Sequence, residues 1–467
     1  MSLAEIQSDL GASILQLQWM MNMYGICVCI PLLTVGKLGD AYGRKKFYAL
    51  GLMGLGLACL GGGLAQSPEW IILSMALFGL SAAPILTLSQ ALMVHQYPES
   101  EKSKAVALWA TFTSLALAAG PLVGGVILRY LSWRWIFFID APVALLSLCF
   151  VYRYVKKEQT HSVHCDWSGV GLLALIVGAL VTAIMQGPNW GWGSASVLSL
   201  FALALIAIFF LIALEKKSRE PMFSPELFSH RGFLFPSICN GFLIGFVWSI
   251  FFFIPLYLQN QQGFSPLETG ITLLFVTLPV SSLSVFANRL YEKIGAKPLL
   301  MAGFSLLFLS VFFQSYLPIQ LACLLMGFGW VLTFGPSTSR ALTTLPHDMA
   351  GIASGMYMTM QEIGGVMGLA LSGVVFRMST TQYLAPKMEE IQSVFGSQTQ
   401  SVLSDPLLAE QTNHRIAGWL HEGFAVGYAN MLWFLSALTL VGIVCALALP
   451  KQKKTGFAGS TKRRQDK

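Results

Sequence analysis

One acidic residue interrupts a long apolar stretch of this 467-residue chain. Glu362 lies within M-T-M-Q-E-I-G-G-V-M-G. If this stretch crosses a bilayer, a charged side chain there costs about 3 kcal/mol, so such acids are rare and usually face a cavity. We predict that Glu362 exchanges a proton or meets a cation. The alternative is a carboxylate that snorkels or pairs with a polar group of a neighbouring helix.

A short segment rich in glycine and charge, G-K-L-G-D-A-Y-G-R-K-K, runs from Gly36 to Lys46. Its glycines permit a tight turn between two helices, and Asp40 and Arg44 can form an ion pair across the helix ends. We predict a conformational latch loop that is made and broken as two helical halves move. The alternative is that the basic residues only set topology. The latch residues are Gly36, Gly39, Asp40, Gly43, Arg44 and Lys45.

A second motif, A-L-A-A-G-P-L-V-G-G-V-I, contains Gly120, Pro121, Gly124 and Gly125. We predict that Gly120 and Gly124 form a small-residue face on which another helix approaches closely. Pro121 removes a backbone hydrogen bond and bends its helix. Such a bent contact can seal a pathway, although glycine-rich packing faces are common in membrane helices.

The elements that carry these motifs are predicted to be membrane-spanning helices. Of all residues, 55% are hydrophobic and only 11% are charged. A bilayer core about 30 Å thick needs roughly 20 apolar residues per helix, and about thirteen such runs follow one another. They cover approximately residues 14–36, 46–66, 69–93, 105–128, 136–155, 168–187, 195–214, 233–257, 269–288, 299–317, 319–342, 353–376 and 425–449.

The distribution of basic residues predicts the orientation of these helices. Most of the 29 Lys and Arg residues lie in segments on one side, which the positive-inside rule places in the cytoplasm. The N-terminus is then outside and the C-terminus inside. The net charge of +7 forms no continuous basic face, so nucleic acid is an unexpected partner. The basic residues predicted to lie outside are Arg129, Arg134, Arg377, Lys387 and Arg415.

An internal repeat indicates two halves with one plan. The segment from Gly36 aligns with N-R-L-Y-E-K-I-G-A-K-P from Asn288, an offset of 252 residues. Arg289, Glu292 and Gly295 are therefore predicted to form a second latch. By the same offset, the run at 233–257 lacks a partner in the first half. We expect that a first helix is missing through truncation or a late start codon. The alternative is a chain that inserts with an exposed N-terminus.

These motifs resemble the major facilitator superfamily. The segment from Gly36 resembles its signature loop, and the Gly120 motif looks like that of its drug exporters. W-R-W-I-F-F-I-D-A-P from Trp133 and D-W-S-G-V-G-L-L from Asp166 are similar to its 14-helix drug:proton antiporter branch. The chain departs from that branch at Met75 and Phe78, where Arg and Gln are usual, which puts the usual proton coupling in doubt.

We therefore expect an all-α membrane protein with the major facilitator fold: two pseudo-symmetric bundles and two extra central helices. Its parts are residues 1–160, 161–231 with the extra helices, 232–450 with a long external loop at 377–424, and a basic tail at 451–467. In that loop, M-E-E-I-Q-S-V-F is predicted to form an amphipathic helix.

The resemblance implies multidrug efflux by proton antiport and alternating access. The substrates would be small lipophilic or cationic compounds, and the location would be a bacterial inner membrane. Export of one endogenous metabolite and a truncated, non-transporting relic are the alternatives. We expect no enzyme activity, no cofactor and no metal, because the seven His residues are scattered and no nucleophile–base set is visible. Expected partners are the lipid bilayer, the substrate and the proton, for a monomer or a complex with a periplasmic adaptor.

Overall fold

The computed structural model describes residues 2–98, 101–155, 167–216, 225–345, 350–396 and 414–450. Within these ranges the regular structure is helical and contains no strand, which confirms the predicted all-α class. The predicted basic tail at 451–467 lies outside the described residues.

The first half contains a short helix followed by five long ones. Local signals set their starts: Ser13 forms a capping box with Gln16, and Ser67 caps a helix that opens with Pro68. The helices are α1 (Leu3–Leu10), α2 (Ile14–Tyr42), α3 (Arg44–Gly63), α4 (Pro68–His95), α5 (Lys102–Tyr130) and α6 (Arg134–Tyr154).

Two further helices, α7 (Trp167–Trp190) and α8 (Ala195–Glu215), separate the halves along the chain. They match the two extra helices that the sequence predicts. The second half comprises α9 (Pro225–Ser229), α10 (Arg231–Gln262), α11 (Pro266–Ile294), α12 (Ala296–Phe312), α13 (Ile319–Thr343), α14 (Ala350–Leu384), η3 (Ala385–Lys387), α15 (Met388–Phe395) and α18 (His414–Leu447).

Each of the thirteen predicted spans falls on one long helix. Among the described residues, eleven helices are long and apolar enough to cross a membrane. The remaining two are α12, an apolar helix of 17 residues, and α2, which has 29. The chain is therefore a multi-pass integral membrane protein.

The repeat is visible in local geometry. The 252-residue offset carries α2 onto α11 from end to end, and Gly43 onto Gly295. Both helices begin with a capping box, formed by Ser13 in α2 and by Ser265 in α11. Both end at a glycine with positive φ, 101° at Gly43 and 82° at Gly295. Two copies of one helical plan explain this match.

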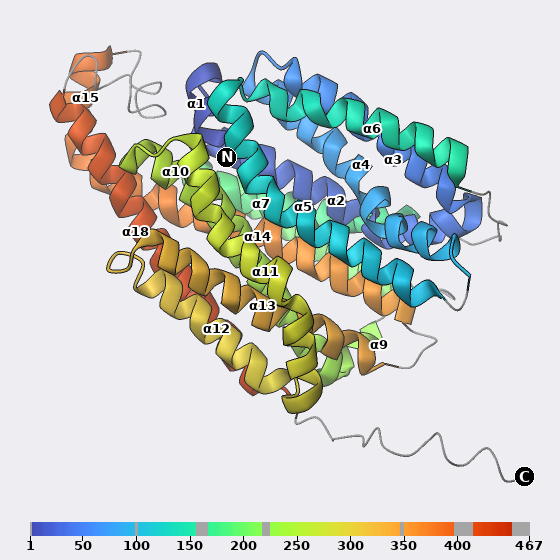
Figure 1. The fold of residues 1–467 in the computed structure, drawn as a ribbon. Helices are drawn as coiled ribbons and strands as arrows, with labels where there is room; N and C mark the ends of the chain where they lie inside the picture. Colours follow the sequence, from blue (N-terminus) through green and yellow to red (C-terminus); the bar gives the residue numbers. More distant parts are fainter. Residues whose placement is uncertain are drawn as a thin grey trace, which may run out of the picture.

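Two seams join the halves. At one seam α5 packs against α11, and the two run side by side in Figure 1. At the other, α2 packs against α14. Helix α7 contacts both α2 and α14, and α8 packs on α7. The extra helices therefore cover the α2–α14 seam.

The predicted limits of the long loop, 377–424, are wrong. Helix α14 continues to Leu384, and α18 already begins at His414. The predicted amphipathic helix M-E-E-I-Q-S-V-F is confirmed as α15 (Met388–Phe395), with Ile391 buried against Ile416 and Leu420 of α18. Apolar and aromatic contacts between α14 and α18 continue beyond the expected ends of their membrane spans. These two helices therefore extend as a hairpin beside α15 (Figure 1).

Candidate functional site at the seams between the halves

Glu362 lies in α14 and faces the α2–α14 seam. Its half-buried carboxylate interacts electrostatically with the Tyr24 hydroxyl and the Cys29 thiol, both on α2. The side-chain amide of Gln361 donates a hydrogen bond to Glu362 Oε1 at 3.2 Å. Glu362 therefore belongs to the second half but meets side chains of the first.

Aromatic rings from three helices meet at Tyr24, the tyrosine that interacts with this acid. The Tyr24 ring stacks on Trp248 of α10 with centroids 6.0 Å apart, and meets Phe78 of α4 edge-on at 5.8 Å. The acid and the rings thus come from α2, α4, α10 and α14. From the sequence, Trp248 is only one of many rings that could line a path for lipophilic cations, with packing the preferred interpretation, and nothing places Tyr24 or Phe78 beside the acid.

Glycines hold α14 close to its neighbours around Glu362. A β-carbon on Gly364 or Gly368 would clash with the backbone of Gly241 or Gly245 in α10. A β-carbon on Gly25 of α2 would clash with Val366 and Trp248. Only glycine permits this approach, which fixes the position of the acid.

The first predicted latch loop is mostly helical. Helix α2 runs to Tyr42 and α3 starts at Arg44, so Gly43 alone forms the break. Gly39 serves packing rather than a turn, since a β-carbon there would lie 2.9 Å from Leu88 of α4, whereas Gly36 has only Thr87 near it, at 3.9 Å. The structure does not describe the Asp40 side chain, so the predicted Asp40–Arg44 ion pair lies outside the described residues.

Lys45 has a partner that the sequence did not suggest. Its ammonium group donates hydrogen bonds to the carbonyl oxygens of Tyr152, at 3.1 Å, and Val155, at 2.5 Å. These carbonyls lie in the last turn of α6 and at its C-cap residue, where a cation satisfies unpaired acceptors and interacts favourably with the helix dipole.

The second latch repeats this cap. Lys297 donates to the carbonyl oxygens of Leu447, at 2.5 Å, and Leu449, at 3.4 Å, at the end of α18. Gly295 forms the helix break, while Arg289 and Glu292 are exposed. In the described part of the chain neither of these two forms an ion pair. The repeated feature is therefore a lysine cap.

The predicted antiporter motif lies on the α5–α11 seam, but with different contact residues. A β-carbon on Gly125 would lie 2.9 Å from the Pro266 carbonyl oxygen, and one on Gly270 would lie 2.5 Å from that of Pro121. Gly120 faces open space and Gly124 is half-buried. The helices thus meet at Pro121 and Gly125, one position on from the predicted pair.

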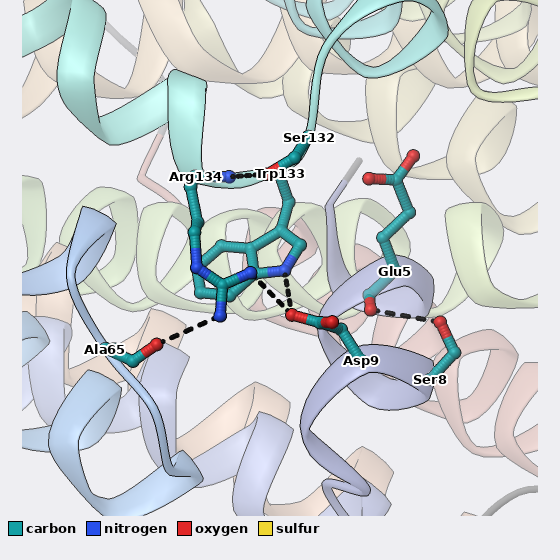
Figure 2. A network of polar contacts seen from close by, with 7 residues as sticks. All are labelled: Glu5, Ser8, Asp9, Ala65, Ser132, Trp133 and Arg134. Carbon is teal, nitrogen blue, oxygen red and sulfur yellow. Dashed lines mark hydrogen bonds and ion pairs between the residues drawn. The ribbon is translucent and has the colours of Figure 1, made fainter.

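A polar network ties α1 to the start of α6 (Figure 2). Arg134 Nη1 lies 2.6 Å from Asp9 Oδ2, and the Trp133 indole N–H donates to the same oxygen at 3.0 Å. Arg134 Nη2 also donates to the Ala65 carbonyl oxygen at 3.2 Å. These hydrogen bonds, first from Arg134 and then from Trp133, lower the pKa of Asp9.

Within the residues that the structure describes, no three His, Cys, Asp or Glu side chains gather in a way that could hold a metal ion. At the α2–α14 seam the chemistry available near Glu362 is that of a carboxylate and aromatic faces, while the helix-capping lysines lie within each half.

Comparisons with known proteins agree with this architecture. The family described as Major Facilitator Superfamily matches residues 1–164 and 167–369. The chain is 29% identical to multidrug resistance protein Stp of Mycobacterium tuberculosis, over 83% of this chain and 74% of that protein. It is 24% identical to multidrug export protein EmrB of Escherichia coli, over 94% of this chain and 89% of that protein.

A solved structure shares the fold at low identity. It is a bacterial homologue of the human lysosomal transporter Spinster, in an inward-facing and unoccupied conformation. Its TM-score is 0.64 at 13% identity, with 96% of this chain and 92% of that chain covered.

Proposed function

The chain belongs to the major facilitator superfamily, and from this premise we propose that it exports small lipophilic or cationic compounds in exchange for protons. It is a transporter with multidrug-export relatives. The direction, the substrates and the coupling ion are the proposed part.

The observation that carries the proposal is the position of Glu362 beside Tyr24, whose ring in turn contacts Phe78 and Trp248. A carboxylate attracts a cation, and aromatic faces stabilise it by about 0.5–2 kcal/mol per contact. A single carboxyl group that binds either a proton or a cationic substrate can exchange one for the other. Met75, at the usual Arg position of the branch, packs against the apolar core. Coupling therefore falls to Glu362 in this proposal.

Alternating access is supported by the two seams. The small residues at Pro121, Gly125 and Gly270 let the halves touch at the ends of α5 and α11 that the charge count places outside. Rocking the halves about this contact would move the Glu362 site from one side to the other.

We place the protein in the inner membrane of a bacterium with its N-terminus outside. The hairpin formed by α14, α15 and α18 would then project externally, where a periplasmic adaptor could dock. Arg415 and Glu390 form an ion pair across this hairpin at 3.2 Å, which supports a rigid surface for such a partner.

The test is proton-driven ethidium transport in proteoliposomes that contain purified Glu362→Gln. Because the amide keeps the shape but cannot ionise, we expect transport driven by a pH gradient to fall at least about tenfold. The matched control is Glu389→Gln in α15, an exposed acid outside the seam, which should transport like the wild type. Unchanged proton-driven transport by Glu362→Gln would refute the coupling role.

A further inference from the structure

A second polar cluster lies near the outer end of the α2–α14 seam, at the place where α7 covers it. The Arg377 guanidinium of α14 donates to the Met185 carbonyl oxygen of α7 at 2.7 Å and to the Gly373 carbonyl oxygen at 3.4 Å. The Asn22 amide of α2 donates to the Met185 sulfur at 3.1 Å. Gln18, also on α2, lies directly against the α-carbon of Gly373.

Several polar atoms of this cluster have no hydrogen-bond partner. Gln18 is fully buried, yet both its amide nitrogen and its amide oxygen are unpaired, as is Oδ1 of Asn22. Leaving a buried polar atom unpaired costs about 1–3 kcal/mol. Such a set of atoms indicates a missing partner.

The charge of Arg377 is also uncompensated. Within the described ranges, no carboxylate lies within ion-pair distance of its guanidinium, which bonds only to carbonyl oxygens. A half-buried cation at membrane depth is stabilised by a counter-charge. Three of the five guanidinium N–H groups remain to donate to an anion.

The pseudo-symmetric position in the other seam shows that packing alone does not require these side chains. The 252-residue offset carries Pro121 onto Gly373, Gly125 onto Arg377, and Gln18 onto Gly270. At the α5–α11 seam, small residues make this contact without any charge. The α2–α14 seam has an arginine and an amide in the same places.

We propose that Arg377, Gln18 and Asn22 bind a phosphate group that carries hydroxyl groups, as in the headgroup of an anionic phospholipid. The phosphate accepts hydrogen bonds from Arg377 and from the Gln18 amide nitrogen. Its hydroxyl groups donate to the unpaired oxygens of Gln18 and Asn22. The same chemistry is available from a free phosphate in solution, so the test separates the two sources.

Depth and surroundings favour the lipid. Gln18 lies four residues after the start of α2, and Met185 lies five residues before the end of α7. At about 1.5 Å per residue, both lie roughly 6–8 Å below the helix ends, close to the headgroup level of a leaflet. An apolar cluster that includes the buried side chains of Val181, Ile184 and Val374 packs beside the polar groups and shields them from water on that side.

The experiment measures lipid binding to the full-length protein in detergent by native mass spectrometry. Phosphatidylglycerol and phosphatidylcholine are titrated separately, and inorganic phosphate is the third ligand. We expect Arg377→Gln to weaken phosphatidylglycerol binding at least about tenfold, because a charge-assisted hydrogen bond is lost. Gln18→Leu, which fills the same space without polar atoms, should weaken it as well.

Arg129→Gln is the matched control. Arg129 is an exposed arginine in the last turn of α5, at the same side of the membrane. It should bind phosphatidylglycerol like the wild type. If Arg377→Gln does not fold, Gln18→Leu decides the outcome.

Tighter binding of phosphatidylglycerol than of inorganic phosphate supports a lipid headgroup as the ligand. Equal binding of the two supports the same phosphate site with free phosphate from solution as the ligand. Equal phosphatidylglycerol binding by the wild type, Gln18→Leu and Arg377→Gln would overturn the proposal. The proposal would also be overturned if phosphatidylglycerol and phosphatidylcholine bound equally well and inorganic phosphate did not bind.

Discussion

At the residue scale, the Asp9 carboxylate holds α1 to the segment before α6. It accepts hydrogen bonds from Arg134 and from the Trp133 indole, and the Arg134 guanidinium lies 4.4 Å from the centre of the Trp133 ring (Figure 2). The Asp9 side chain is 46% exposed, so solvent screening keeps the ion pair weak. The network is thus a modest clamp at the start of the first half.

This clamp should respond to acid. Because the folded pKa of Asp9 lies below its ordinary value of 3.8, its stabilisation is full above about pH 4 and is lost as the pH falls through the lowered folded pKa. We expect Asp9→Asn to reduce stability by about 0.5 kcal/mol at pH 7, and by a shrinking amount below pH 4. Urea unfolding at both pH values checks this.

Arg134→Gln should have an effect like that of Asp9→Asn, and the double variant should lose little more. A difference between wild type and Asp9→Asn that persists unchanged at pH 3 would rule out the ion pair as its cause.

The sequence predicts a functional residue only where the residue type is unusual for its surroundings. Glu362 stands out in the sequence as an acid in an apolar run, and it lies at the seam. Its companions Tyr24, Phe78 and Trp248 do not stand out, since the chain has 32 Phe, 13 Tyr and 12 Trp. Which ring faces the seam depends on helix rotation and on glycine contacts such as Gly25 with Trp248, which no local pattern encodes.

At the element scale, Lys45 and Lys297 each close the end of the last helix in their own half. The predicted loop of charges is a one-residue break at Gly43, and the lysine that follows it reaches across to α6. Sequence reasoning identified the motif and its repeat. It could not give the partner, because the α6 carbonyls lie more than 100 residues away.

The caps give a reciprocal prediction. Lys45→Met keeps the length of the side chain but removes the donor and charge, which should cost up to about 1 kcal/mol at the end of α6. Amide hydrogen exchange in the last turn of α6 should then rise up to about fivefold. The last turn of α18 should not change.

Lys297→Met should give the mirror result, with faster exchange at the end of α18 only. Each variant is therefore the control for the other. Equal acceleration at both helix ends by either variant would be inconsistent with local capping.

At the scale of the whole molecule, the two halves meet along two seams of unlike chemistry. The repeat predicted that the halves share a plan, and α2 and α11 match from end to end. The repeat could not predict that α5 would meet α11 through Pro121 and Gly125 rather than Gly120. A shift of one residue on a helix turns the contact by about 100°, and only the packed structure fixes that rotation.

A cross-link across a seam should stop transport. In Gly125→Cys with Leu267→Cys, a β-carbon at 125 would lie 3.1 Å from the α-carbon of Leu267 and 2.9 Å from the Pro266 carbonyl oxygen, so a small shift of α5 away from α11 brings the two cysteines to disulfide distance. Because the proposed alternating access requires the halves to separate there, we expect oxidation to abolish proteoliposome transport and a reductant to restore it.

The matched control joins two helices of one half. A β-carbon on Gly56 of α3 would lie 3.8 Å from that of Ala144 in α6, so Gly56→Cys with Ala144→Cys can also form a disulfide. This pair should transport in both redox states. Full transport by the oxidised variant with cysteines at 125 and 267 would show that the α5–α11 contact does not open.

The placement of α7 makes the two flanks of the protein unequal toward lipid. With α7 and α8 packed over α2 and α14, that flank has a protein wall, whereas among the described helices the α5–α11 flank has no such cover. Between the leaflets, a hydrophobic compound dissolved in the membrane therefore meets the junction of the halves directly on the α5–α11 flank, whereas α7 stands between the lipid and the junction on the other flank.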